Sequence, residues 1–383
     1  MNGIGSVGGL PGVSGGDVRW IEIAKCWQRA GHIINVFTPN SGKDLCQRLG
    51  LNATFHINYV PNDYSIKTYL LKYVKARFIP DSLADFKGVI YSSTEHFYDV
   101  LPALKIKRKN KENVWVTVIH WVAPLKRNGT SLLNSFLFYL NQQGGFRYIR
   151  KEADVVLAVS DSTTEHVKRI GITRNVFSVG AGVAFNEIRE TVTKLDCKQY
   201  DAVFMKRLDG TKGVFDIVEI WKDVVKTKPD ALLGIIGLGT KSAMDKLNRM
   251  VADFGLSDNV DVLGPIYDFE KKMSVLGSSK LFVLPSYEEN WAIVIGEAMA
   301  AGVPVICYNI PEIRPIWGNN VTWIPKGNKT IFAKEIISLL DNNHARNTLS
   351  KMSVLFIEKY DWERIATEEL KIINDAHVPT IKM

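Results

Sequence analysis

The feature that most constrains the fold is an alternation of short apolar runs with longer amphipathic stretches, which occurs twice along the chain. Short runs that are apolar throughout are typical of strands buried on both faces, and strands that alternate with helices predict a parallel sheet covered by helices. The expected strands are 33–37, 88–91, 114–119 and 155–159, then 200–205, 231–236, 260–263, 281–284 and 303–307. The expected helices include 18–29, 214–226, 242–254 and 290–301. The predicted fold class is α/β.

The length indicates two domains, because single cores stop growing at about 250–300 residues and this chain has 383. Residues 186–199 are polar and poorly periodic, and we interpret them as a linker. It would join an N-terminal Rossmann-like domain, residues 1–185, to a C-terminal one, residues 200–359. Residues 360–383 are amphipathic, and we expect a helix there that crosses back to the first domain.

The composition is that of a globular protein, with 46% apolar and 23% charged residues, and it excludes a disordered, collagenous or disulfide-scaffold chain. Four cysteines without C-x-x-C spacing indicate reduced thiols. Residues 1–16 lack the basic and apolar regions of a signal peptide, and the nearly uncharged stretch 291–308 contains Glu297 and a Gly-Val-Pro break. We expect a cytoplasmic protein, either soluble or peripheral on the cytoplasmic membrane face.

The net charge of +8 belongs to the first half, since residues 1–185 hold 23 basic and 13 acidic side chains. Residues 105–151 alone hold ten basic side chains and one acidic. Apolar segments at 69–78 and 132–140 accompany them, and basic plus apolar surface suits an anionic membrane. The alternative is a buried helix flanked by solvated charge. Nucleic acid is disfavoured as a partner, because no zinc-finger, helix-turn-helix or RNA-binding aromatic pattern occurs.

A glycine-rich segment, residues 8–16, precedes the first expected helix. It is neither G-x-G-x-x-G nor a Walker A loop. Glycines such as Gly15 and Gly16 allow backbone amides to approach an anion, and the helix start adds partial positive charge. The alternative interpretation is a flexible terminus.

Two further motifs follow strands of the second half. Residues 206–213 present Arg207 and Lys212, whose charges suit a diphosphate, although a solvated basic turn is the alternative. Residues 285–299 contain Glu289 and Glu297, two carboxylates that would accept hydroxyl hydrogen bonds. A buried carboxylate such as Glu297 is costly unless it is paired, which argues against two ordinary helix charges. A helix that begins near residue 290 would also expose donor amides, those of Asn290, Trp291, Ala292 and Ile293.

The order of these motifs resembles the retaining GT-B glycosyltransferases, specifically glycosyltransferase family 4. The resemblance covers nearly the whole chain and is most specific from Arg207 to Glu312. Besides the segments above, it rests on His120, Val159-Ser160, Gly213, Gly237-Leu238-Gly239, Gly264, Ala300-Ala301-Gly302, Pro304-Val305-Ile306 and Pro311-Glu312-Ile313.

The resemblance implies two Rossmann-like domains facing across a cleft, with a nucleotide-diphosphate sugar on the C-terminal domain and the acceptor approaching from the N-terminal domain. The donor would be a UDP- or GDP-sugar, without a separate cofactor. The implied binding and catalytic residues are these: Arg207 and Lys212 on the diphosphate, Glu289 on hydroxyls of the transferred sugar, Glu297 on the ribose, Gly237 and residues 290–293 around the nucleotide sugar, Gly15 and Gly16 approaching the diphosphate from the other domain, and His120 beside the transferred sugar.

Several positions depart from the family pattern. Lys206 replaces the usual glycine before the diphosphate arginine, Asn290-Trp291-Ala292 replaces the usual Gly-Phe-Gly, and Ala181 replaces a common asparagine. Only residues 1–7 are available for the strand that normally opens the fold.

The expected activity is retaining transfer of a hexose-type sugar to a glycan or lipid-linked acceptor. The chain has no D-x-D motif, which predicts a metal-independent reaction and no metal site. The alternatives are another GT-B enzyme, phosphorylase-like or epimerase-like, and a non-catalytic sugar-nucleotide binder.

Overall fold

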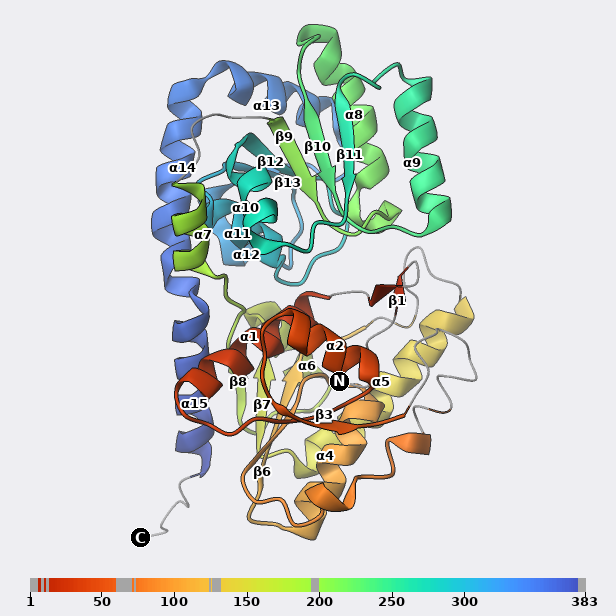
Figure 1. Ribbon diagram of the computed structural model, residues 1–383, viewed down its shortest axis with the longest axis vertical. Coiled ribbons are helices and arrows are strands. Elements are labelled where there is room, and N and C mark those ends of the chain that lie inside the picture. The colour runs from red at the N-terminus through yellow and green to blue at the C-terminus, as the bar shows by residue number, and fades with distance from the viewer. Residues whose placement is uncertain are drawn as a thin grey trace. The chain divides into compact units, whose positions relative to one another are not determined.

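The computed structural model describes residues 6–7, 10–11, 14–59, 71, 74–123, 125, 132–193 and 200–377. The chain divides into two compact units (Figure 1). Unit 1 comprises residues 1–181 and 362–383, and unit 2 comprises residues 182–361. The segment expected to be a linker differs from the prediction, because helix α7 (Phe185–Val192) occupies its first half within unit 2. Residues 194–199 lie outside the described residues.

Unit 2 contains one parallel six-stranded sheet with the order β11-β10-β9-β12-β13-β14. In chain order this is the 3-2-1-4-5-6 arrangement of nucleotide-binding Rossmann folds. The strands are β9 (Tyr200–Met205), β10 (Leu233–Ile236), β11 (Val260–Gly264), β12 (Ser279–Leu284), β13 (Val305–Tyr308) and β14 (Val321–Ile324). The order reverses between β9 and β12, so the fold has its switch point there.

The helices of unit 2 follow the strands in the expected alternation. They are α8 (Val214–Thr227), α9 (Lys241–Asp253), α10 (Phe269–Gly277), α11 (Ile293–Ala300), α12 (Arg314–Trp317), α13 (Lys329–Asp341) and α14 (Asn343–Ile357). The prediction that a helix begins near residue 290 is wrong by three residues. Ala292 adopts a left-handed conformation with φ of 61°, and the helix begins only after it.

Unit 1 contains a parallel four-stranded sheet in the order β5-β6-β7-β8 and a separate parallel pair, β3 and β4. The strands are β3 (Asn35–Thr38), β4 (Thr54–Ile57), β5 (Val89–Ser92), β6 (Val114–Ile119), β7 (Val155–Ala158) and β8 (Val176–Ser178). The first strand starts later than predicted, since Ile33 is 87% exposed. In place of a full opening strand, β1 (Ser6–Val7) pairs antiparallel with β2 (Leu10–Pro11).

Strand β6 shows why the four-stranded sheet is covered on both faces. Trp115 and Ile119 pack into a core with residues of α4 (Phe97–Lys109), α5 (Leu132–Glu152) and α6 (Asp161–Arg169). Val114, Val116 and Val118 point the other way and pack with Ile373 of α15 (Trp362–His377) and Trp27 of α1 (Gly15–Arg29). This alternation follows from the two-residue period of a strand. The α/β class is confirmed, with two Rossmann-like domains.

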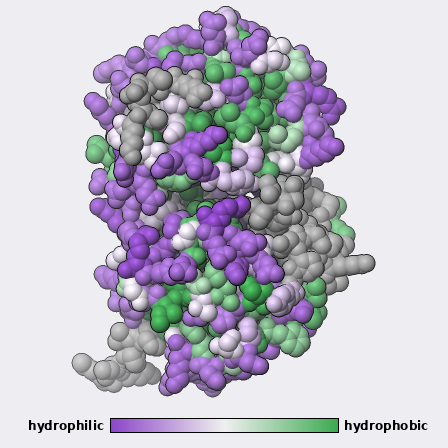
Figure 2. All heavy atoms as spheres, in the orientation of Figure 1, coloured by the Kyte–Doolittle hydropathy of each residue, from purple (hydrophilic) through white to green (hydrophobic). Residues whose placement is uncertain are grey.

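Three further findings bear on the sequence-based expectations. The described cysteines, Cys26, Cys46 and Cys307, are buried and form no disulfide with one another, and Cys197 lies outside the described residues. Among the described helices, we find no candidate for a membrane-spanning segment. The face drawn in Figure 2 is mainly hydrophilic, with hydrophobic residues in separate patches.

Candidate functional site

Two loops at the switch point of unit 2 bring together the predicted donor residues. In doubly wound sheets, ligands bind outside the carboxyl ends of the strands where the strand order reverses. Strand β9 ends at Met205 and is followed by residues 206–213, and β12 ends at Leu284 and is followed by residues 285–292. The basic motif at residues 206–213 and the motif that contains Glu289 are therefore neighbours in space.

Short contacts fix these two loops to each other. The backbone N–H of Tyr287 donates to the carbonyl of Thr211 at 2.9 Å, and the hydroxyl of Ser286 donates to the same carbonyl at 3.3 Å. Gly213 has φ of 78°, and a Cβ there would clash with the carbonyl oxygen of Pro285. Only glycine meets both conditions without strain.

The carboxylate of Glu289 lies at the centre of this arrangement, and its side chain is 5% exposed. Its Oε1 accepts a hydrogen bond from the Ser286 hydroxyl at 2.9 Å and lies 3.2 Å from Nζ of Lys212. Its Oε2 lies 3.1 Å from Nζ of Lys206. Two lysines from one loop therefore share one carboxylate from the other. In the sequence, Lys206 is a departure from the family pattern without a predicted role.

Burial and charge act against each other at this carboxylate. Burial raises the pKa of Glu289, but the ammonium groups of Lys206 and Lys212 outweigh it, and the pKa lies below its ordinary value. The pKa of Lys212 is lowered, mainly because burial disfavours its charge and Lys206 lies nearby, while Glu289 acts in the opposite direction. Glu289 is an ionised hydrogen-bond acceptor at neutral pH.

Arg207 and Gly237 lie in the same region. The guanidinium of Arg207 is exposed and lies 3.5 Å from a carboxylate oxygen of Asp209, which is a loose pair. Asp209 itself accepts hydrogen bonds from the backbone of Thr211 and Lys212. At Gly237 a Cβ would clash with the carbonyl oxygen of Lys206, so glycine is needed beside the end of β9. Arg207 is free to turn toward an anion.

The second predicted carboxylate, Glu297, has a different partner. Its Oε1 lies 3.1 Å from Nζ of Lys272 on α10. A carboxylate in apolar surroundings is costly unless it is paired, and Glu297 is paired. Glu289 and Glu297 belong to two separate ion-pair groups.

The amides between these carboxylates differ from the expectation because α11 begins late. Ala292 occupies the N-cap position without a side-chain cap, so the free donors of the first turn start at Ile293. Trp291 is a core residue, whose ring packs against Trp317 at 4.6 Å, and its carbonyl accepts from the Trp317 indole at 3.0 Å. Asn290 and Trp291 form a turn and not the first turn of the helix.

In unit 1, two predicted residues contact each other. His120 follows β6, and its Nε2 lies 2.9 Å from the carbonyl of Ser93, so Nε2 carries the hydrogen and donates. A Cβ on Gly16 would lie 3.1 Å from the His120 ring, so the start of α1 packs on this side chain. Gly15 begins the helix after Ser14, whose side chain and Asp17 form a capping box. Burial lowers the pKa of His120, against the opposing effect of Glu95.

Sequence reasoning missed the buried group behind His120. Glu95 accepts from the backbone N–H of His120 at 3.3 Å and from the amide of Gln142 at 2.8 Å. Gln142 also donates to the carbonyl of Trp121 and accepts from the N–H of Ala123. The signal was Gly144-Gly145 inside α5, since a Cβ on Gly145 would clash with the carbonyl of Glu95. Adjacent glycines within a helix indicate a close backbone approach.

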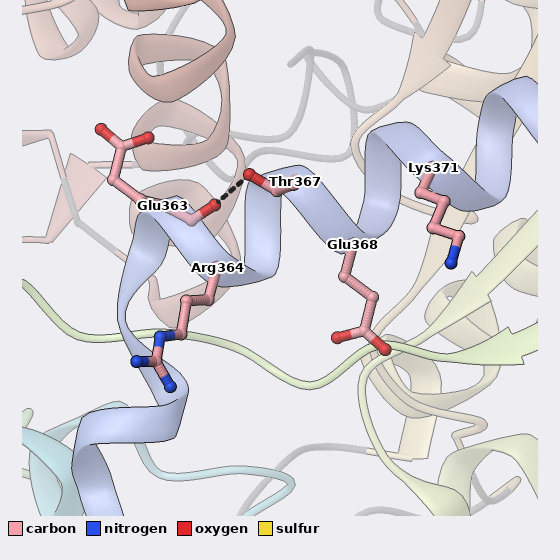
Figure 3. Close-up of a pocket in the computed structure, with 5 residues that line it drawn as sticks. All are labelled: Glu363, Arg364, Thr367, Glu368 and Lys371. Carbon is pink, nitrogen blue, oxygen red and sulfur yellow. Dashed lines mark hydrogen bonds between the residues drawn. The ribbon is translucent and has the colours of Figure 1, made fainter.

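We also looked for a metal site and for a second pocket among the described residues. Among the residues the structure describes, no group of three or more His, Cys, Asp or Glu side chains could hold a metal ion. Figure 3 shows a hollow along α15, lined by Glu363, Arg364, Thr367, Glu368 and Lys371. All five residues come from one helix, and the Thr367 hydroxyl donates to the Glu363 carbonyl at 2.7 Å. None of them is a predicted site residue.

A family model matches the part of the chain that contains the predicted donor residues. Residues 186–353 match the family described as Glycosyl transferases group 1. This segment is less than half of the chain, and it contains Arg207, Lys212, Gly237, Glu289 and Glu297.

Two curated relatives each match less than half of the chain. The phosphatidyl-myo-inositol mannosyltransferase of Mycobacterium leprae is 26% identical over 174 residues, which are 44% of this chain and 45% of that protein. The putative teichuronic acid biosynthesis glycosyltransferase TuaC of Bacillus subtilis is 28% identical over 190 residues, 46% of this chain and 45% of that protein. The chain thus spans about half the length of these relatives.

Solved structures extend the similarity of fold to nearly the whole chain. HepE from Anabaena, in complex with UDP and glucose, has a TM-score of 0.74 at 16% identity, covering 94% of this chain and 96% of that one. Sucrose-phosphate synthase from Thermosynechococcus elongatus has a TM-score of 0.72 at 16% identity, covering 92% and 91%. The fold is that of GT-B glycosyltransferases, and identities this low establish the fold alone.

Proposed function

We propose that this protein is a glycosyltransferase that takes a hexose-type sugar from a UDP- or GDP-sugar. The observation that carries the proposal is the Glu289 carboxylate, buried and ionised beside Lys212 at the switch point of unit 2. This cluster lies in the segment that matches the group 1 family. A nucleotide-sugar donor fits it because cations suit the diphosphate and a fixed carboxylate suits sugar hydroxyls.

The proposed mechanism retains the configuration at the transferred carbon. The glycosidic bond to the diphosphate breaks as the acceptor oxygen approaches on the same face, through an oxocarbenium-like transition state. Arg207 and Lys212 stabilise the charge that develops on the departing diphosphate, together with the free amides at the start of α11. Glu289 holds sugar hydroxyls, and Glu297 accepts from the ribose. The donor's own phosphate oxygen accepts the acceptor proton.

In unit 1, His120 has the role of orienting the sugar as a neutral imidazole. Its Nε2–H is already committed to Ser93, and its pKa is lowered by burial, so it is not a cation at neutral pH. The Glu95–Gln142 pair fixes the backbone on either side of it. These contacts support positioning as its contribution, since a preorganised group needs no rearrangement during the reaction.

For the acceptor we propose a glycan or lipid-linked molecule at an anionic membrane surface. Leu132, Leu133, Phe136 and Leu140 of α5 are 69%, 56%, 47% and 48% exposed. The alternative of a buried helix does not account for these exposures. Part of the expected basic excess is neutralised, because Lys107 pairs with Asp154 at 2.7 Å and Arg108 pairs with Glu152. Lys126 and Arg127 lie outside the described residues, as do residues 69–70 and 72–73 of the segment 69–78.

The experiment that tests the function is turnover of a panel of UDP- and GDP-sugars, followed as release of the nucleoside diphosphate. Glu289→Ala should abolish transfer to an acceptor while the variant remains folded at the assay temperature, as its circular dichroism spectrum would show. Glu270→Ala on α10 is the matched control, since this exposed glutamate has no proposed role. Turnover that Glu289→Ala leaves unchanged would refute the assignment of the donor site.

Metal independence is a separate part of the proposal, based on the missing D-x-D motif. Transfer in excess EDTA should proceed at the rate seen without chelator. A complete loss that magnesium or manganese restores would overturn this part alone.

A further inference from the structure

We propose that Lys206 is a positioning residue, the counter-ion that keeps Glu289 in place when Lys212 turns to the donor diphosphate. The inference rests on the proposed function, because it concerns the same donor site. It assigns a role to a position where the family that the sequence resembles usually has glycine.

The geometry shows one carboxylate shared by two cations. Nζ of Lys206 lies 3.1 Å from Oε2 of Glu289, and Nζ of Lys212 lies 3.2 Å from Oε1. The side chains of the two lysines are 18% and 14% exposed, and that of Glu289 is 5% exposed. In the part of the chain that the structure describes, these are the ion pairs found for Glu289. Each lysine holds a different oxygen, so either can leave while the other remains.

A charge count shows why both lysines are useful. The diphosphate of a bound nucleotide sugar brings about two negative charges to the site, and Arg207 with Lys212 supplies two positive charges. If Lys212 were the sole partner of Glu289, its transfer to the diphosphate would leave a buried carboxylate uncompensated. Such a group is strongly disfavoured, since burial without a partner penalises the charged form. Lys206 removes this conflict, because its pairing with Glu289 survives the departure of Lys212.

The backbone holds Lys206 in position for this role. Its N–H donates to the carbonyl of Ile236 at 3.0 Å, which continues the pairing of β9 with β10. Its carbonyl lies against Gly237, where any side chain would clash. The position is therefore fixed at the end of a central strand, and only the side chain reaches Glu289. Lys212, in contrast, ends a single turn of 3-10 helix, Gly210–Lys212, in the connection after the strand.

The test measures the binding of UDP and of GDP to the full chain by calorimetry. In Lys206→Met, Lys212 is retained by Glu289, so the affinity for the nucleotide that the natural chain binds more tightly should fall about tenfold or more. Lys206→Arg preserves the charge and should bind within about threefold of the natural chain. Adding Glu289→Gln to Lys206→Met removes the buried charge, and the double variant should regain most of the lost affinity. A merely structural role for Lys206 predicts no such recovery.

Lys280→Met is the matched control. Lys280 pairs with Asp201 at 2.7 Å, near the opposite end of the β9–β12 pair in the same unit. Its loss should leave nucleotide binding unchanged. Lys206→Met that binds as tightly as the natural chain, or a double variant that binds no more tightly than Lys206→Met, overturns the inference. A natural chain that binds neither UDP nor GDP overturns the proposed function, and this inference with it.

Discussion

Arg19 and Glu369 form an ion pair in the core of unit 1, although 350 positions separate them in the sequence. Both side chains are almost fully buried. Arg19 also donates to the carbonyl of Gly180 at 2.7 Å, and the hydroxyl of Tyr91 donates to Glu369 at 3.1 Å. The pair joins α1 to α15, so the last helix completes the core of the first unit. Burial opposes the charge on Arg19, but the nearby Glu369 raises its pKa.

Removing one member of this pair should destabilise unit 1 strongly. Glu369→Ala leaves the Arg19 guanidinium buried without its counter-ion, and we expect a loss of about 3–5 kcal/mol, measured by urea unfolding. Arg29 and Glu363 also join α1 to α15, but both side chains are more than half exposed. Glu363→Ala should therefore cost less than about 1 kcal/mol. Equal losses in the two variants would contradict this account of the core.

Alanine substitutions at Gly213 and Gly255 would separate the cost of a steric clash from the cost of a left-handed backbone conformation. Both glycines have positive φ, but a Cβ would clash with the Pro285 carbonyl at Gly213, and it would meet nothing within 4 Å at Gly255. Gly255→Ala should cost about 1–2 kcal/mol for the left-handed conformation. Gly213→Ala should cost about 1–3 kcal/mol more and weaken nucleotide binding, because it forces the two site loops apart. Thermal unfolding and UDP or GDP titration of both variants would check this, and equal costs would argue against the tight approach.

Much of the fold could be predicted because its strands are buried on both faces. The expected strands 114–119 and 200–205 coincide with β6 and β9, which consist mostly of apolar residues. The start of α11 was not predicted, since alanine itself does not favour the left-handed conformation that Ala292 adopts, and the signal lay in the glycine that the family pattern usually has at this position. Propensity describes average residues, and a single residue held in an uncommon conformation by tertiary contacts escapes it.

The candidate site was predicted in part for a similar reason. Arg207, Lys212 and Glu289 follow strands, and parallel strands bring their carboxyl ends together at one edge of a sheet, so their proximity could be anticipated. The pairing of Lys206 with the same carboxylate, and of Gln142 with Glu95, depends on how side chains orient after folding. Neither pair has a sequence spacing that reveals it.

The family pattern normally has glycine at the position of Ala292, and glycine there should make unit 2 more stable. The φ of 61° at Ala292 is unfavourable for any side chain, so Ala292→Gly should stabilise unit 2 by about 1 kcal/mol in chemical unfolding. Ala252→Gly, at an exposed position in α9, should instead destabilise it by about 0.5–1 kcal/mol. Destabilisation by both changes would mean that contacts of the Ala292 methyl group outweigh the strain.

The buried side chain of His120 predicts that the stability of unit 1 depends on pH. Burial lowers the pKa of His120 from its ordinary value of 6.5, with Glu95 acting in the opposite direction. The unfolded chain therefore binds more protons than the folded chain just below pH 6.5, and stability should fall as the pH decreases through that value. His120→Asn should show a shallower fall between pH 7.5 and 5.5 in urea unfolding of unit 1. An unchanged slope would show that His120 does not titrate differently in the two states.

The exposed apolar face of α5 should bind anionic membranes through both apolar contact and charge. Leu132, Phe136 and Leu140 are spaced four residues apart and lie on one side of the helix. The chain should sediment with vesicles that contain phosphatidylglycerol, less with neutral vesicles, and less again at high salt because screening weakens the basic contribution. Phe136→Ser with Leu140→Ser should reduce binding at least about fivefold, since each buried apolar side chain contributes about 1.5–3 kcal/mol.

The control for this membrane-binding test is Leu355→Ser, at a 75% exposed position of α14 in unit 2, which should bind as the natural chain does. Binding that is insensitive to salt, or equal losses in the control and the α5 variant, would remove the membrane from the proposal.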